Sequence, residues 1–350
     1  MNESEFMALA VTEARKGLGK TWTNPCVGAV IVKDNRVIAT GYHHRFGEAH
    51  AEIDALRHLS SPEAAKGATM YVTLEPCSHF GKTPPCANAI VRHGIARVVI
   101  GNVDPNPLVS GQGVAILRAA GVQVTIQNIG FTLNRAYAAL YRRHRPTITL
   151  KYAMSLDGKI NAAGRGRTMI SSRGAYLDSQ ALRAEHQAVL VGENTFKVDN
   201  PALTVREQPV AFPPIRVVMV RDVNTVEDSM SIFKTDGPVW LLSEQSAHRQ
   251  FPDTVEVFVA AHWTVERICQ LLAAHNIVSL LVEGGSRIHA EFVKAQAVDR
   301  IVTYVSPIIL GGSALPSVTG ISTAMIADFQ PLKVTSLMPD IKLETERRGQ

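Results

Sequence analysis

The stretch that decides the fold is "VGAVIVKDNRVIATGYHHRFGEAHAEIDAL", residues 27–56. Its first part holds two β-rich runs around the turn residues "KDN" (33–35), a pattern that predicts a β-hairpin. Its last part, "HAEIDAL" (50–56), begins a helix. His50 and Glu52 stand two residues apart there, and residues at that spacing do not share a helix face. The pair therefore needs an explanation other than amphipathic packing.

Beyond residue 56 the chain keeps alternating between strand and helix patterns. This alternation predicts an α/β sheet covered by helices. The expected strands are residues 70–74, 97–101 and 122–126, and the expected helices are residues 86–93 and 113–121.

The pattern resets around "YRRHRPTITL" (141–150), where Pro146 closes a basic helix end and a new strand begins at Thr147. A chain of 350 residues is about twice the usual domain size. We therefore expect two domains, residues 1–145 and 146–350. No sequence repeat links the halves, so the second is a different α/β domain. Its expected strands are residues 147–153, 187–192, 215–220, 238–243, 279–283 and 300–305.

The composition is that of a folded globular protein, with 46% hydrophobic and 19% charged residues. No apolar stretch approaches the roughly 18 residues of a membrane span. The start, "MNESEFMALAVTEARKG" (1–17), is acidic and amphipathic rather than signal-like. We expect a cytoplasmic protein without a membrane partner.

The net charge of the chain does not distinguish a nucleic-acid ligand from a small phosphorylated one. The net charge is +5, and Lys and Arg are dispersed except at "RRHR" (142–145). Nucleic-acid binding is possible on this balance, but small phosphorylated substrates suit a few scattered Arg equally well.

Two of the four cysteines lie in one Pro-rich segment, "LEPCSHFGKTPPCANAI" (74–90). Cys86 falls at a helix start, where the positive dipole end favours the thiolate that a metal needs. His50, Cys77 and Cys86 would supply three zinc ligands and leave the fourth position to water, an arrangement typical of catalytic zinc. Cys26 and Cys269 have no other candidate metal ligands near them in the sequence and are expected to be ordinary small residues.

Glu52 has a place in such a site. It need not share the face of His50, because it only has to reach the zinc-activated water across the helix end and pass its proton to a leaving amine. H-x-E followed by P-C and a second Cys is the zinc deaminase signature, although eight residues separate these cysteines instead of the usual two. Each residue alone is more often structural; the four together favour catalysis.

The first half resembles the deaminase domain of bifunctional riboflavin-biosynthesis deaminase-reductases. The resemblance is carried by "TNPCVGAVIV" (23–32), "GYHHRFGEAHAE" (41–52), "VTLEPCSHFGKTPPC" (72–86) and "DPNPLVSGQG" (104–113). It implies a cytidine-deaminase-like three-layer α/β domain, in which zinc hydroxide deaminates 2,5-diamino-6-(5-phosphoribosylamino)pyrimidin-4(3H)-one. It also implies that Asn24, His43, His79 and Lys82 line the pocket, with loop solvation as the alternative.

The second half is similar to the reductase half of that family, through "KYAMSLDGKI" (151–160), "VGENTFKVDNPALTVR" (191–206) and "LLVEGGSRIHAEFV" (280–293). This implies a dihydrofolate-reductase-like α/β domain that uses NADPH to reduce the ribosyl group to ribityl. Independently, Gly284-Gly285 makes a turn between a strand and a helix and allows a close approach to the helix N-terminus. Such a terminus is an anion site suited to a pyrophosphate. A plain tight turn is the alternative, because there is no G-x-G-x-x-G.

The resemblance implies two sets of residues in this domain. Cofactor contacts would come from Ala153, Met169, Ser171, Thr195, Asp199, Arg221, Gly285, Ser286, Arg287 and Ile288. Substrate contacts would come from Lys151, Arg167, Arg183, Leu203, Arg206 and Glu283. Arg183 and Arg206 would suit a phosphate as a fork.

Three departures from the family pattern affect these contacts: Met169 stands where Trp is frequent, Arg167 where Ser is frequent, and Val220-Arg221 where Asp-Ser is frequent. We hypothesise that Arg221, at the end of a strand, meets the 2′-phosphate of NADPH. An exposed loop Arg is the alternative.

Three functions remain open. The leading one is a homo-oligomeric two-step enzyme of riboflavin biosynthesis that acts on a small phosphorylated pyrimidine, with Zn²⁺ and NADPH and without nucleic acid. The second is a deaminase whose reductase domain is weak or altered. The third is a nucleic-acid base deaminase, which would leave the eight-residue insertion and the second domain unexplained.

Overall fold

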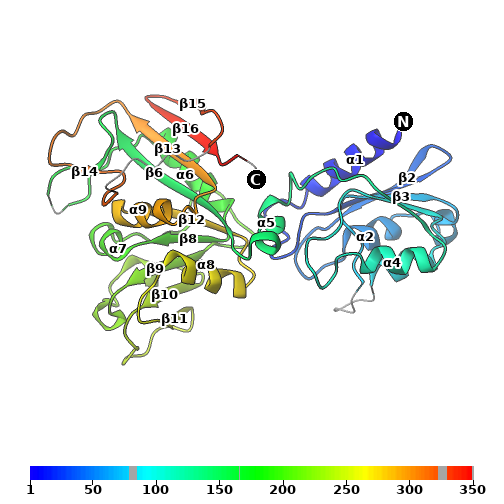
Figure 1. The fold of residues 1–350 in the computed structure, drawn as a ribbon, viewed down its shortest axis with the longest axis horizontal. Coiled ribbons are helices and arrows are strands. Elements are labelled where there is room, and N and C mark those ends of the chain that lie inside the picture. Colours follow the sequence, from blue (N-terminus) through cyan, green and yellow to red (C-terminus); the bar gives the residue numbers. More distant parts are fainter. Residues whose placement is uncertain (79–84, 165, 322–328, 349–350) are drawn as a thin grey trace. The chain divides into compact units, whose positions relative to one another are not determined.

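The computed structural model describes residues 1–78, 85–164, 166–321 and 329–348. The chain divides into two compact units, Met1–His144 and Arg145–Gln350 (Figure 1). Among the described residues, no helix is both long enough and apolar enough to cross a bilayer.

The first unit is built on a five-stranded sheet. In spatial order its strands are β2 (Arg36–Tyr42), β1 (Gly28–Lys33), β3 (Thr69–Val72), β4 (Arg97–Ile100) and β5 (Gln123–Ile126). β1 runs antiparallel to both neighbours, whereas β3, β4 and β5 are parallel. The predicted hairpin is confirmed: Asp34 and Asn35 make its turn with positive φ angles of 48° and 58°, as tight hairpin turns require.

Helices cover both faces of this sheet, which gives three layers (Figure 1). Alternate residues of a strand face opposite sides: Val30 and Val32 pack with α1 (Glu3–Arg15), and Ala29 and Ile31 pack in the core on the other face. The helices of that other face are α2 (Ala51–Arg57), α3 (Cys86–Arg92) and α4 (Gln112–Ala119). A short η1 (Pro62–Ala65) and α5 (Arg135–Arg143) complete the unit.

The second unit is built on a nine-stranded sheet. In spatial order its strands are β11 (Val255–Val259), β10 (Val239–Ser243), β9 (Ile215–Val220), β8 (Ala188–Val191), β12 (Ser279–Gly284), β6 (Thr147–Ser155), β13 (Arg300–Ser306), β16 (Asp340–Glu346) and β15 (Lys333–Leu337). The first seven are parallel, and β16 and β15 continue antiparallel.

Strands and helices alternate through most of this unit. The remaining elements are β7 (Lys159–Asn161), paired with β14 (Leu315–Pro316), the helices α6 (Arg173–Ala184), α7 (Glu193–Asp199), α8 (Val265–Ala274) and α9 (Ser286–Lys294), and the short η2 (Val223–Thr225) and η3 (Ser231–Lys234). The six predicted strands are present, and the predicted α/β fold class is confirmed for both units. Strands β7, β11, β14, β15 and β16 were not predicted.

A buried ion pair fixes the start of the second unit. The Arg145 guanidinium donates to both carboxylate oxygens of Asp299, at 2.6 and 2.8 Å. Asp299 also accepts from the Ile148 backbone N–H at 2.8 Å, and its side chain is only 3% exposed. The pair therefore anchors the beginning of β6 beside the beginning of β13.

We expect Asp299→Ala to destabilise the second unit by about 3 kcal/mol, because it leaves a largely buried guanidinium unpaired. Urea unfolding followed by tryptophan fluorescence measures this, since Trp240 and Trp263 lie in that unit. The double variant Arg145→Met with Asp299→Ala should recover part of the loss. Equal stability of the single and double variants would contradict the importance of the pair.

Candidate active sites

Three metal-ligand side chains meet in the first unit. One donor atom each from His50, Cys77 and Cys86 lies within 4.8 Å of the other two, the one such cluster found among the described residues. His50 is the N-cap of α2, Cys86 is the first residue of α3, and Cys77 follows β3. The cluster therefore joins two helix starts to a strand end.

The first turn of α3 binds the loop that carries Cys77. The Cys86 backbone N–H donates to Cys77 Sγ at 3.3 Å, and the Ala87 N–H donates to the Cys77 carbonyl oxygen at 3.3 Å. Hydrogen bonding with Cys86, aided by His50, lowers the pKa of the Cys77 thiol to about 4. Thiolate character is therefore favoured at Cys77, whereas the same contact, together with burial, raises the pKa of the Cys86 thiol.

The donor set fits zinc. One imidazole nitrogen and two sulfurs at this spacing can surround an ion with bonds of about 2.0 to 2.3 Å and leave a fourth tetrahedral position open. Cys86 Sγ lies 3.4 Å from His50 Nδ1, close enough for both to share one ion. Cys26 and Cys269 are buried free thiols, and burial raises the pKa of each.

Glu52 lies beside this cluster in the first turn of α2. It is only 3% exposed, and burial raises the pKa of its carboxyl to about 7. A carboxyl with that pKa can take up or release a proton near neutral pH, as a general acid-base catalyst must.

Two of the predicted pocket residues contact one another next to His50. His43 is buried; its Nδ1 donates to the Ala49 carbonyl oxygen at 3.0 Å, and its Nε2 accepts from the Asn24 amide at 3.1 Å. Its ring meets that of His50 edge-on, with centroids 5.4 Å apart. Burial lowers the pKa of His43, which favours the neutral form of the ring. His79 and Lys82, also predicted here, lie outside the described residues.

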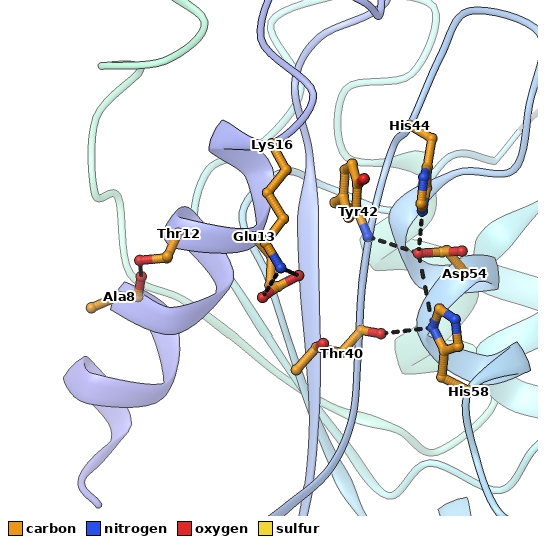
Figure 2. A network of polar contacts seen from close by, with 9 residues as sticks. All are labelled: Ala8, Thr12, Glu13, Lys16, Thr40, Tyr42, His44, Asp54 and His58. Atoms are coloured by element: carbon orange, nitrogen blue, oxygen red, sulfur yellow. Dashed lines mark hydrogen bonds and ion pairs between the residues drawn. The ribbon is translucent and has the colours of Figure 1, made fainter.

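Asp54, four residues after His50 in the sequence, joins α2 to β2 (Figure 2). Its carboxylate accepts from the Tyr42 backbone N–H and from His44 Nε2, both at 3.0 Å. His58, 4.0 Å from the same carboxylate, donates to the Thr40 carbonyl oxygen at 3.0 Å. These contacts fix the helix that carries Glu52 and is capped by His50. Sequence reasoning missed Asp54, although it stands one helical turn after His50.

The second unit holds a cavity of about 970 Å³ beyond the C-terminal ends of β8, β9, β10 and β12. Ligands of open α/β sheets bind at this edge. All ten predicted cofactor residues line it, namely Ala153, Met169, Ser171, Thr195, Asp199, Arg221, Gly285, Ser286, Arg287 and Ile288.

The start of α9 fits an anionic group. Its N-cap is Gly285, which offers no side-chain cap, so amides of the first turn remain available to a ligand. A Cβ at Gly285 would lie 3.0 Å from Thr195 Oγ1, so the close approach to α7 favours glycine. Ser286 Oγ is buried and has no hydrogen-bond partner among the described residues. A pyrophosphate oxygen could satisfy that hydroxyl.

The predicted substrate residues are divided. Lys151, Arg167 and Glu283 line the cavity, whereas Arg183, Leu203 and Arg206 are not among its lining residues. Burial lowers the pKa of Lys151, whose ammonium lies 5.5 Å from the centre of the Tyr304 ring.

The structure does not assemble Arg183 and Arg206 as a phosphate fork. Arg183 donates to both oxygens of Glu283 at 2.7 Å and to the Thr204 carbonyl oxygen at 2.9 Å, which occupies its guanidinium. Arg206 is exposed and lies 5.7 Å from the ring centre of Tyr176. Although burial opposes it, the Arg183 charge, with Lys151, lowers the pKa of Glu283 to about 2. Arg183 therefore holds Glu283 ionised at the cavity wall.

Arg221 is exposed at the end of β9, on the rim of this cavity. Glu244, at the end of β10, also lines the cavity, but its carboxylate is hydrogen-bonded to His262 Nδ1 at 2.9 Å. Among the described residues, no ion pair joins Arg221 to Glu244, so the guanidinium can meet an anionic ligand.

Known proteins match both units. Residues 146–343 match the family model of the RibD C-terminal domain, and residues 1–102 match the cytidine and deoxycytidylate deaminase zinc-binding region. Riboflavin biosynthesis protein RibD of Bacillus amyloliquefaciens is 39% identical over 97% of this chain and 95% of its own length. The Escherichia coli (strain K12) protein of the same name is 37% identical over 98% of this chain and 99% of its own length.

Solved structures agree. Acinetobacter baumannii RibD superposes with a TM-score of 0.88 at 33% identity, over 98% of each chain. The diaminohydroxyphosphoribosylaminopyrimidine deaminase/5-amino-6-(5-phosphoribosylamino)uracil reductase of Thermotoga maritima does so with a TM-score of 0.85 at 35% identity, over 98% of each chain. Because such relatives match over nearly the whole length, the chain belongs to the RibD family of riboflavin biosynthesis proteins.

Proposed function

We propose that this chain catalyses two successive steps of riboflavin biosynthesis, one in each unit. The first unit would deaminate 2,5-diamino-6-(5-phosphoribosylamino)pyrimidin-4(3H)-one, and the second would reduce the ribosyl group of the product to ribityl. Family membership and the two activities named for the Thermotoga maritima relative support this assignment. The observation that carries it is the open cluster of His50, Cys77 and Cys86 with the buried carboxyl of Glu52 beside it.

In the deaminase unit, His50, Cys77 and Cys86 would hold zinc. When bound, zinc lowers the pKa of a coordinated water and so supplies a nucleophile near neutral pH. Glu52 takes a proton from the attacking water and delivers it to the exocyclic amino group, which leaves as ammonia. The raised pKa of Glu52 suits both halves of that transfer.

Asn24 and His43 would orient the pyrimidine. The side-chain amide nitrogen of Asn24 donates to His43 Nε2. The side-chain oxygen of Asn24, Oδ1, is therefore left to accept from a substrate N–H. His79 and Lys82 remain predicted substrate contacts, with Lys82 suited to the phosphate.

In the reductase unit, NADPH would supply the hydride. The first turn of α9 and the Ser286 hydroxyl would bind the pyrophosphate. Lys151, Arg167 and Glu283 would face the substrate from the cavity wall. Arg183 would act through Glu283, and Leu203 and Arg206 remain predicted contacts.

The other two functions have less support. A deaminase with an altered reductase would not need the ten predicted cofactor residues around one cavity. A nucleic-acid base deaminase would leave the second unit without a role. A cytoplasmic location suits the free cysteines, which stay reduced there, and a homo-oligomer remains a prediction.

We expect Glu52→Gln to reduce ammonia release at least 100-fold, because the amide cannot carry the proton. Oxidation of NADPH with the deaminated substrate should be unchanged, because the two reactions use separate units. The matched control is Glu13→Gln, which alters a buried carboxyl on α1. Loss of both activities, or of neither, would refute the assignment.

We expect Arg221→Ala to weaken NADP⁺ binding about tenfold while NAD⁺ binding stays the same, since the change removes a charged partner of the 2′-phosphate. Titration calorimetry with both nucleotides gives the two Kd values. Arg173→Ala, an exposed arginine outside the cavity, is the control. An unchanged ratio of the two Kd values would show that Arg221 does not read the phosphate.

A further inference from the structure

Glu75 is a buried carboxylate two residues before Cys77. It is 4% exposed and accepts three backbone hydrogen bonds: from Asp104 N–H at 3.2 Å, Gly111 N–H at 2.9 Å and Val114 N–H at 3.0 Å. All three donors lie in the loop before α4 or in its first turn. The carboxylate therefore joins the end of the β3 segment to the start of α4.

Helix α4 has no cap of its own. Its N-cap is Gly111, which has a positive φ of 77° and no side chain to accept from the first-turn amides. Those amides need acceptors, and the positive end of the helix dipole favours a negative one. Glu75 fills both requirements from a segment that is distant in sequence.

A second contact presses the same segment against α4. A Cβ added at Gly113 would lie 2.0 Å from the Pro76 carbonyl oxygen and 3.2 Å from Glu75 Cγ. On the far side of Cys77, Ser78 Oγ lies 3.4 Å from Gln112 Oε1. Residues on both sides of Cys77 therefore contact the first turn of α4.

Cys77 is thus held between two helix starts. The first turn of α3 donates to its sulfur and its carbonyl oxygen, and the first turn of α4 holds the residues around it through Glu75 and Gly113. A metal ligand must be held by such supporting contacts, because its position sets the affinity for the ion.

We infer that Glu75 is a positioning residue of the metal centre, which sets Cys77 for the ion by anchoring its loop to α4. This inference rests on the zinc deaminase function proposed above. It also gives the segment "DPNPLVSGQG" (104–113) a role, because two of the three amides that bind Glu75, those of Asp104 and Gly111, belong to it.

The test uses two variants of the full chain, Glu75→Gln and Gly113→Ala. The first turns an amide N–H₂ toward backbone N–H donors, and the second forces α4 away from Pro76 and Glu75 while leaving the Glu75 carboxylate in the chain. We expect zinc affinity, measured by competition with a chromophoric chelator, to fall about 10- to 100-fold in both. The visible spectrum of the Co²⁺-substituted protein should shift, while NADPH oxidation with deaminated substrate stays unchanged.

Glu13→Gln is the matched control, because it alters a buried carboxyl of the same unit on the opposite face of the sheet, and it should leave zinc affinity as in the wild type. Wild-type zinc affinity and Co²⁺ spectrum in both variants would overturn the inference. So would zinc loss that occurs only where circular dichroism shows the first unit unfolded. A wild-type chain that binds no zinc would instead refute the proposed function.

Discussion

The first unit depends on one constraint: three side chains from separate segments must present donor atoms within 4.8 Å of one another. Each segment ends or begins at that point. His50 is the N-cap of helix α2, Cys86 is the first residue of helix α3, and the chain leaving β3 reaches Cys77. Separate contacts hold each one, through Asp54 for α2, the Cys86 amide for α3 and Glu75 for the Cys77 loop. Backbone hydrogen bonds, rather than the metal alone, preform the site.

The second unit also places its site where strands end and a helix begins, but for a different ligand. Its parallel strands end along one edge, where the start of α9 offers amides and the buried Ser286 hydroxyl. Charge is organised by pairing: Arg183 holds Glu283 ionised, and Lys151 lies over Tyr304 close to them. The cavity thus has a helix start for an anion and a wall of fixed charges for a polar substrate.

Local signals in the sequence predict much of this architecture. Turn residues between β-rich runs predict the hairpin of β1 and β2, and buried hydrophobic runs predict the central parallel strands. The zinc cluster is predictable because His50, Glu52, Cys77 and Cys86 form short motifs. Strands β15 and β16 were not predicted because they are largely polar, and they occupy the last two positions of the sheet, with β15 at its edge. Two further contacts could not be predicted from the sequence: the pairing of Arg183 with Glu283 and the backbone amides around Glu75. Both join segments that are distant in sequence and leave no local pattern.

The most direct test of the central claim is anomalous diffraction from crystals of the zinc-loaded protein, recorded on both sides of the zinc absorption edge. The account predicts one anomalous peak in the first unit, bonded to His50 Nδ1, Cys77 Sγ and Cys86 Sγ, with no fourth protein ligand. A peak elsewhere, or a fourth protein side chain on the ion, would contradict an open catalytic centre.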